Sequence, residues 1–207
     1  MSIKNEFRKN IIFIIAILTV LTVGLFVLLI LGKEQSFILL NGYHRHWLDD
    51  FFTYYTYLGN GLFSVVVFLI LFILKKKTMA VAILISFLLS GILAQILKRI
   101  FSMPRPKIVF NDGLYQHFID GVTVSGHHSF PSGHTATAFA MLFTFILLVK
   151  HTGLKWAILF LTIMVGYSRI YLGQHFLSDV LAGIAVGILS GTIAVYLEKK
   201  MPPKLRA

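Results

Sequence analysis

Apolar segments long enough to cross a lipid bilayer dominate this chain, and they limit the folds that it can adopt. Hydrophobic residues make up 57% of the 207 residues, and the mean hydropathy is +0.83. These values exceed those of an ordinary soluble domain. Inside a bilayer every backbone N–H and C=O group needs an internal partner, so the spanning segments are expected to be α-helices. The sequence therefore predicts an all-α, polytopic membrane protein.

Six transmembrane helices are predicted, and together they form a single bundle domain over residues 1–207. The first apolar run is too long for a signal-peptide core and is expected to remain as a span. Residues 33–60 are too polar to span and carry Trp and Tyr, which favours a loop with an interfacial helix. This segment could act as a lid or as a simple interfacial anchor. The predicted spans are residues 11–31, 57–74, 79–97, 132–149, 155–171 and 175–197.

The positive charges indicate how the bundle is oriented. Six spans put both termini on one side, and twelve of the 19 Lys and Arg residues fall on that side. The positive-inside rule then places both termini in the cytoplasm. The net charge of +11 is thus interpreted as a topology signal and not as a nucleic-acid surface. The expected location is a bacterial-type cytoplasmic (inner) membrane, with the active site at the periplasmic or outer face.

One polar stretch, SRIYLGQHFLSD from Ser168 to Asp179, interrupts the last long apolar region. Ionisable groups at the edge of a hydrocarbon layer are costly and usually functional. His175 and Asp179 are four residues apart, so they share one face if both lie on a helix. A carboxylate beside an imidazole fixes its tautomer and leaves the other nitrogen free to act as a nucleophile or base. A polar helix cap or an interhelical link is the structural alternative for this stretch alone.

Two further polar clusters are predicted at the same membrane face. Lys98 and Arg105 lie in the segment KRIFSMPRP, and the segment PSGH holds Ser132, Gly133 and His134. Guanidinium and ammonium groups match phosphate oxygens. The N-terminus of the helix predicted after Pro131 offers backbone N–H groups to an anion.

The three clusters together contain the groups needed for phosphoryl transfer through a covalent histidine intermediate. His175 is the expected nucleophile and Asp179 its orienting partner. His134 would protonate the leaving group and then activate water. The residues expected to bind phosphate are Lys98, Arg105, Ser132, Gly133 and Arg169. No metal or other cofactor is expected, because a zinc ion on His134, His175 and Asp179 would compete with nearby cations.

The patterns K-x6-R-P, P-S-G-H and S-R-x5-H-x3-D, in this order, resemble the three-part signature of the type 2 phosphatidic acid phosphatase family. The resemblance covers Lys98 to Asp179, and no motif residue is missing. It implies the same roles. Phosphate would be bound by Lys98, Arg105, Ser132, Gly133 and Arg169, and catalysis would be carried out by His134, His175 and Asp179. Soluble vanadium haloperoxidases share this signature, but the predicted spans argue against that branch.

The expected function is that of a metal-independent lipid phosphate phosphatase whose partners are a lipid phosphate substrate and the bilayer. The resemblance implies a choice among several lipid substrates, of which undecaprenyl diphosphate and phosphatidylglycerol phosphate are favoured. A lipid A phosphatase and a lipid phosphotransferase are alternatives that would use the same residues. A non-enzymatic anionic-lipid binder or transporter is less favoured, since binding alone has no need of the pair formed by His175 and Asp179.

Two other groups of residues have more than one interpretation. His117, His127 and His128 could select a headgroup or could be ordinary surface residues of the loop. Gly183, Gly187 and Gly191 recur at helical spacing, which favours close helix packing within the bundle. The sequence does not indicate an oligomeric state.

Overall fold

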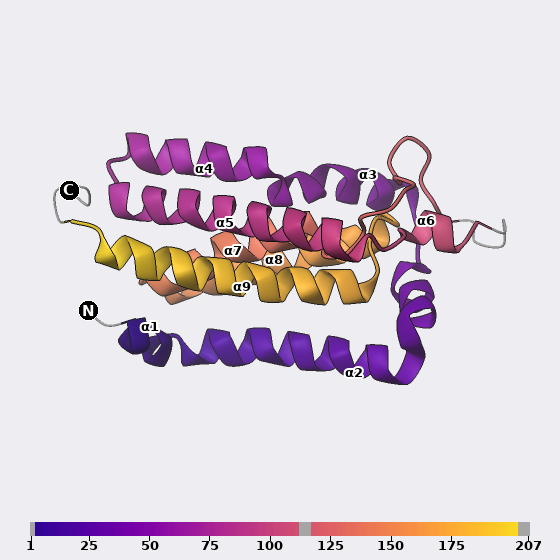
Figure 1. Cartoon of the computed structure of the whole chain (residues 1–207), viewed down its shortest axis with the longest axis horizontal. Helices are drawn as coiled ribbons and strands as arrows, with labels where there is room; N and C mark the ends of the chain where they lie inside the picture. The colour runs from indigo at the N-terminus through magenta and orange to yellow at the C-terminus, as the bar shows by residue number, and fades with distance from the viewer. Residues whose placement is uncertain (1–2, 112–116, 203–207) are drawn as a thin grey trace.

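The computed structural model describes residues 3–111 and 117–202, and every regular element in those ranges is helical. This confirms the all-α prediction. The long helices lie side by side, and α1 and the end of α9 are at the same end of the molecule (Figure 1). The elements are α1 (Ile3–Lys9), α2 (Ile11–Asn41), α3 (His46–Tyr55), the 3₁₀ helix η1 (Thr56–Gly59), α4 (Gly61–Ile73), α5 (Lys77–Phe101), α6 (Pro106–Val109), α7 (Gly133–Leu148), α8 (Thr152–Tyr171) and α9 (Leu177–Lys200).

Four segments in the described ranges are long and apolar enough to cross a membrane: α2, Lys77–Val109, α8 and α9. A fifth is obtained if α3, η1 and α4 count as one span with a bend of 56°. Helix α7 is apolar but has only 16 residues. Twelve of these residues are buried, so α7 is largely enclosed by protein and does not depend on contact with lipid along its length. Length and composition therefore support four or five spans, where the sequence predicted six.

Helix α2 continues beyond the end of the predicted first span. The backbone breaks at Gly32, where φ is 75° and ψ is 179°, and the helix then resumes as far as Asn41. Glycine adopts this conformation without the steric penalty of a side chain. In the resumed part Phe37 is fully buried, and its ring lies 5.4 Å from that of Phe176. Part of the 33–60 segment expected to be a loop is thus helical, because tertiary packing of an apolar side chain stabilises it.

The closest helix packing joins α7 to α9 through a line of glycines. A Cβ atom added at Gly187 would lie 2.6 Å from the Cβ of Phe139 and 2.7 Å from the carbonyl oxygen of Ala136. Similar collisions with α7 would follow at Gly183 and Gly191. The prediction that this stripe serves packing within the bundle is confirmed.

We expect Gly187→Ala to destabilise the protein, because its methyl group would push α9 away from α7. Overpacking of this kind typically costs about 1–3 kcal/mol, which corresponds to a melting temperature lower by roughly 2–10 °C. Thermal unfolding in detergent measures the change. Gly91→Ala is the matched control, because no atom lies within 4 Å of a Cβ at that helical position. Equal melting temperatures for the two variants would contradict the packing argument.

Candidate active site

The three polar segments predicted from the sequence meet at one end of the bundle, where α5 ends, α7 begins and α8 turns into α9. Backbone hydrogen bonds join them: the N–H of Ser132 donates to the carbonyl of Asp179 at 2.9 Å. The N–H of Ser129 donates to Met103 at 2.9 Å, and that of Arg105 donates to Gly126 at 3.0 Å. The segments are therefore held in register by the backbone, independently of their side chains.

The turn between α8 and α9 positions His175. Gly173 has φ +64°, a left-handed conformation that glycine tolerates best. The N–H groups of Gln174 and His175 both donate to the carbonyl of Arg169, at 3.0 and 3.1 Å. Helix α9 then begins at Leu177, so His175 precedes the helix, whereas the predicted span started at residue 175. The turn nevertheless keeps the imidazole near the first turn of α9.

Asp179 lies in the first turn of α9, and three polar groups surround its carboxylate oxygen Oδ2. Oδ2 accepts hydrogen bonds from the N–H of Phe176 at 3.0 Å and from the hydroxyl of Ser129 at 2.6 Å. Nδ1 of His175 lies 3.5 Å from the same oxygen. The side chain of Asp179 is fully buried, so the interactions are shielded from water. The pairing of His175 with Asp179 that the spacing predicts is thus present in the structure.

The environment of His175 favours the neutral imidazole. The residue is 2% exposed, and this burial lowers its pKa well below the ordinary value, although the nearby carboxylate of Asp179 acts in the opposite direction. Arg169 and Arg105 lower the pKa further. A neutral ring carries a lone pair on one nitrogen, which is what nucleophilic attack requires.

Three cationic side chains surround this pair, and neutral oxygens hold them in place. Arg169 donates through Nη1 to the hydroxyl of Thr56 at 2.5 Å, and its buried Nε has no hydrogen-bond partner within the described ranges. Arg105 donates through Nη1 to the backbone oxygen of Gln174 at 2.9 Å and to its side-chain oxygen at 3.2 Å. Lys98 donates to the carbonyl of His128 at 2.6 Å.

None of these three cations forms an ion pair in the part of the chain that the structure describes. Ion pairs found elsewhere in these ranges include His44–Asp49 and Lys199–Glu6, and His175 pairs with Asp179. Buried or half-buried charges are normally neutralised by a counter-charge, because desolvation is expensive. The cluster therefore has the charge of a site that binds an anion.

The N-terminus of α7 reaches the same cluster. Ser132 is its N-cap, and its hydroxyl oxygen accepts hydrogen bonds from the N–H and the hydroxyl of Thr135. Gly133 follows, and a Cβ there would lie 4.0 Å from Cε of Lys98. His134 lies within electrostatic range of Lys98, Arg169 and His175. All eight predicted site residues are therefore brought together, and Ser132 contributes by fixing the start of the helix.

The structure adds three residues that no motif indicated: Ser129, Thr56 and Gln174. Their contacts with Asp179, Arg169 and Arg105 are side-chain interactions between segments distant in sequence. The loop histidines differ from one another. His128 contacts the site through Lys98, since its Nδ1 lies 2.9 Å from the carbonyl oxygen of Lys98. The ring of His117 instead stacks on that of His44, with centroids 5.0 Å apart.

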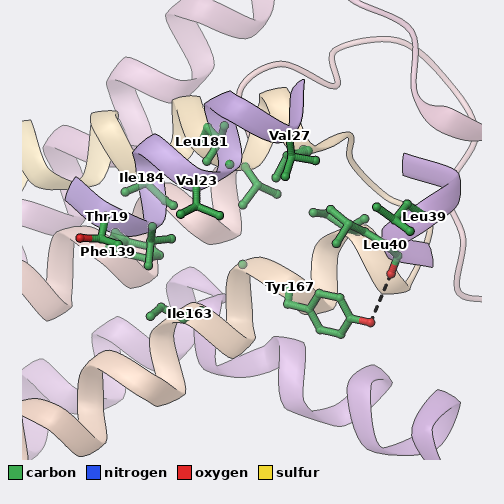
Figure 2. A pocket seen from close by; sticks show the side chains of 16 residues that line it. Thr19, Val23, Val27, Leu39, Leu40, Phe139, Ile163, Tyr167, Leu181 and Ile184 are labelled. Carbon is green, nitrogen blue, oxygen red and sulfur yellow. Dashed lines mark hydrogen bonds between the residues drawn. The ribbon is translucent and has the colours of Figure 1, made fainter. Parts of the chain in front are cut away.

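A separate apolar cavity of about 370 Å³ lies between α2 and the α8–α9 pair (Figure 2). Its two hydroxyl groups are satisfied internally: Thr19 donates to Ile15, and Tyr167 donates to the carbonyl of Leu40. At Gly166 a Cβ would contact Val180 and Thr135 at 3.3 and 3.7 Å. The residues that line the cavity are otherwise apolar, so it offers a hydrocarbon environment.

Comparison with known proteins places this fold and cluster in a family. Residues 79–202 match the model of the PAP2 superfamily, so the chain belongs to that superfamily. The bacitracin transport permease protein BcrC of Bacillus licheniformis is 32% identical and aligns over 83% of this chain and 77% of its own length. The lipid A 4'-phosphatase of Porphyromonas gingivalis is also 32% identical, over 77% of this chain and 70% of its own.

Two solved structures have the same fold. The crystal structure of Aquifex aeolicus LpxE is similar with a TM-score of 0.70 and 32% identity, covering 79% of this chain and 94% of its own. A PAP2-type phosphatidylglycerolphosphate phosphatase of Bacillus subtilis has a TM-score of 0.60, covering 91% of this chain and 97% of its own. Because the identity is 22%, this similarity supports the fold alone. With its apolar helices and these relatives, the chain is a multi-pass membrane lipid phosphatase of the PAP2 superfamily.

We expect orthophosphate to bind the purified protein in detergent, because its oxygens match the three cations of the cluster. Arg169→Lys should raise the dissociation constant about 10- to 100-fold, since a hydrogen bond to a charged group is worth about 1.5–3 kcal/mol. Isothermal titration calorimetry measures the change. Arg99→Lys is the control, because Arg99 is exposed. Equal affinities in the two variants would show that Arg169 does not hold the anion.

Proposed function

We propose that the chain hydrolyses the terminal phosphate of a lipid mono- or diphosphate through a phosphohistidine intermediate on His175. The observation that carries this proposal is the buried pair of His175 and Asp179 beside three cations that form no ion pair within residues 3–111 and 117–202. A binding site needs only the cations. An imidazole kept neutral next to a buried carboxylate adds a nucleophile, which indicates bond making and breaking.

The first step transfers the phosphoryl group to the protein. Nε2 of His175 attacks phosphorus with its lone pair, and the bond from phosphorus to the leaving oxygen breaks. His134, in its protonated form, gives its proton to that oxygen, so the lipid product leaves as an alcohol or as a lipid monophosphate. Arg169, Arg105 and Lys98 stabilise the three equatorial oxygens as charge builds up on them.

The second step releases the phosphate. His134, now neutral, accepts a proton from a water molecule, whose oxygen attacks phosphorus while the bond to Nε2 breaks. His175 returns to its neutral form and orthophosphate is released. In this scheme the charge on the phosphate is neutralised by side chains, so we propose that turnover does not require a divalent metal ion.

For the substrate we favour undecaprenyl diphosphate or phosphatidylglycerol phosphate. Both combine a terminal phosphate, which the cationic cluster can hold, with hydrocarbon that remains in the bilayer. A lipid A phosphatase is the alternative, supported by the relative from Porphyromonas gingivalis. A phosphotransferase would use the same residues and pass the phosphoryl group to a lipid acceptor instead of water.

We also propose a six-span arrangement in an inner membrane, with both termini in the cytoplasm and the site facing outward. It is supported by the position of α1 and the end of α9 at one end of the bundle (Figure 1). In this arrangement α3, η1 and α4 form one bent span and the short α7 another. The lysines at positions 75–77 and 199–200 then gather on the cytoplasmic side, as the positive-inside rule requires.

We expect the protein to release phosphate from at least one lipid in a panel of undecaprenyl diphosphate, phosphatidylglycerol phosphate, phosphatidic acid and lipid A, with EDTA present. His175→Ala should lower turnover at least about 10⁴-fold, the loss typical of removing a catalytic nucleophile or base. It should leave binding of the lipid largely intact, because the cations remain. Inorganic phosphate is measured after incubation in detergent micelles.

His151→Ala is the matched control, because His151 is exposed at the N-terminus of α8. Full turnover by His175→Ala would show that the proposed mechanism is wrong. Transfer of the phosphoryl group to an added acceptor lipid, in place of release, would identify the phosphotransferase. An absolute requirement for a divalent ion would overturn the metal-independent scheme.

The orientation can be tested with single cysteines, since the chain contains none of its own. A membrane-impermeant maleimide should label Ser125→Cys in intact cells, because Ser125 is exposed in the loop beside the site. Lys76→Cys, in the turn between α4 and α5, should be labelled only after permeabilisation. The reverse pattern would place the site in the cytoplasm.

A further inference from the structure

Ser129 lies outside the sequence motifs but directly against the proposed nucleophile and its partner. It is fully buried. Its Oγ atom is 2.6 Å from Oδ2 of Asp179 and 3.3 Å from Nδ1 of His175. The direct separation between Nδ1 and Oδ2 is 3.5 Å, so each of these two atoms lies closer to the hydroxyl of Ser129 than to the other. The hydroxyl thus provides the shorter connection between the two groups.

The chemistry of the three groups determines the direction of these hydrogen bonds. An ionised carboxylate can only accept, so the hydroxyl of Ser129 must donate its hydrogen to Asp179. The hydroxyl has a single hydrogen, so towards His175 its oxygen can only accept. Nδ1 of His175 is therefore the nitrogen that carries hydrogen. In a neutral imidazole the other nitrogen, Nε2, then holds the lone pair.

We infer that Ser129 is a positioning residue that links Asp179 to His175 and fixes the tautomer with Nε2 free to attack. This inference rests on the proposed function, since it assigns Ser129 a role through His175. As the ring becomes positively charged during phosphoryl transfer, the chain Nδ1–H···Oγ–H···Oδ2 stabilises it without moving a proton from one residue to another. The effect appears in the chemical step and not in substrate binding.

The backbone of Ser129 is held separately from its hydroxyl, so that a side-chain substitution tests the link alone. Its N–H donates to Met103 at 2.9 Å, and its carbonyl lies 3.4 Å from the ammonium of Lys98. Both contacts persist when the hydroxyl is removed. The position of Lys98, and with it the binding of the anion, should therefore be preserved in Ser129→Ala.

We expect Ser129→Ala to lower kcat about 10- to 100-fold, the effect of losing one hydrogen bond to a charged group. KM for the lipid and the dissociation constant of orthophosphate should change less than about twofold. Ser129→Thr, which keeps a hydroxyl, should restore most of kcat. Ser125→Ala is the control, because Ser125 is exposed. Steady-state kinetics and calorimetry give these values.

A double-mutant cycle with Asp179→Asn separates the link from a purely structural role. If Ser129 acts through Asp179, the double variant should lose little more activity than Asp179→Asn alone, whereas independent effects would multiply. An unchanged kcat in Ser129→Ala, multiplying losses, or a loss confined to KM and orthophosphate binding would each overturn the inference. Phosphate release that survives in His175→Ala would instead overturn the proposed function, so the two failures are distinguishable.

Discussion

The carboxylate and the backbone of Asp179 join the fold to the proposed chemistry. Its backbone carbonyl accepts a hydrogen bond from the N–H of Ser132. Its side-chain oxygen Oδ2 accepts hydrogen bonds from the N–H of Phe176 and the hydroxyl of Ser129. These contacts fix the start of α7, the start of α9 and the loop between α6 and α7. The group proposed to orient His175 is thus also the group that holds three segments together, so the geometry of the site is set by the fold.

That arrangement depends on the close approach of α9 to α7. A Cβ at Gly183 would lie 2.7 Å from the carbonyl oxygen of Ser132, so only glycine allows α9 to pass this close to the beginning of α7. The glycine stripe, one turn after Asp179, therefore controls the distance across which Asp179 and Ser132 form their hydrogen bond. The polar contacts at the end of the bundle therefore depend on how closely α9 packs against α7 inside it.

The sequence predicted the helical class and the residues of the polar cluster, because motif spacing and hydropathy are local signals. It did not predict the helix beyond Gly32, since burial of Phe37 against Phe176 stabilises that part and sequence periodicity does not show the partner. The contacts of Ser129, Thr56 and Gln174 were not predicted for the same reason: each joins a site residue that is far away along the chain. Helix α7 lies where the span 132–149 was predicted, but its 16 residues are fewer than a typical span has, because a helix enclosed by protein can be shorter than the bilayer requires.

The helix ends give this cluster its electrostatic character. Lys98 lies in the last turn of α5 and Arg169 in the last turn of α8, where the negative end of the helix dipole favours a cation. Helix α7 begins at Gly133 beside Lys98, and a helix N-terminus favours an anion. The C-terminal ends of α5 and α8 therefore stabilise the two cations, and the N-terminal end of α7 attracts the anion that they would bind. The apolar bundle keeps the hydrocarbon of a lipid in the membrane, so the phosphate is the part of the molecule that this end of the bundle can select.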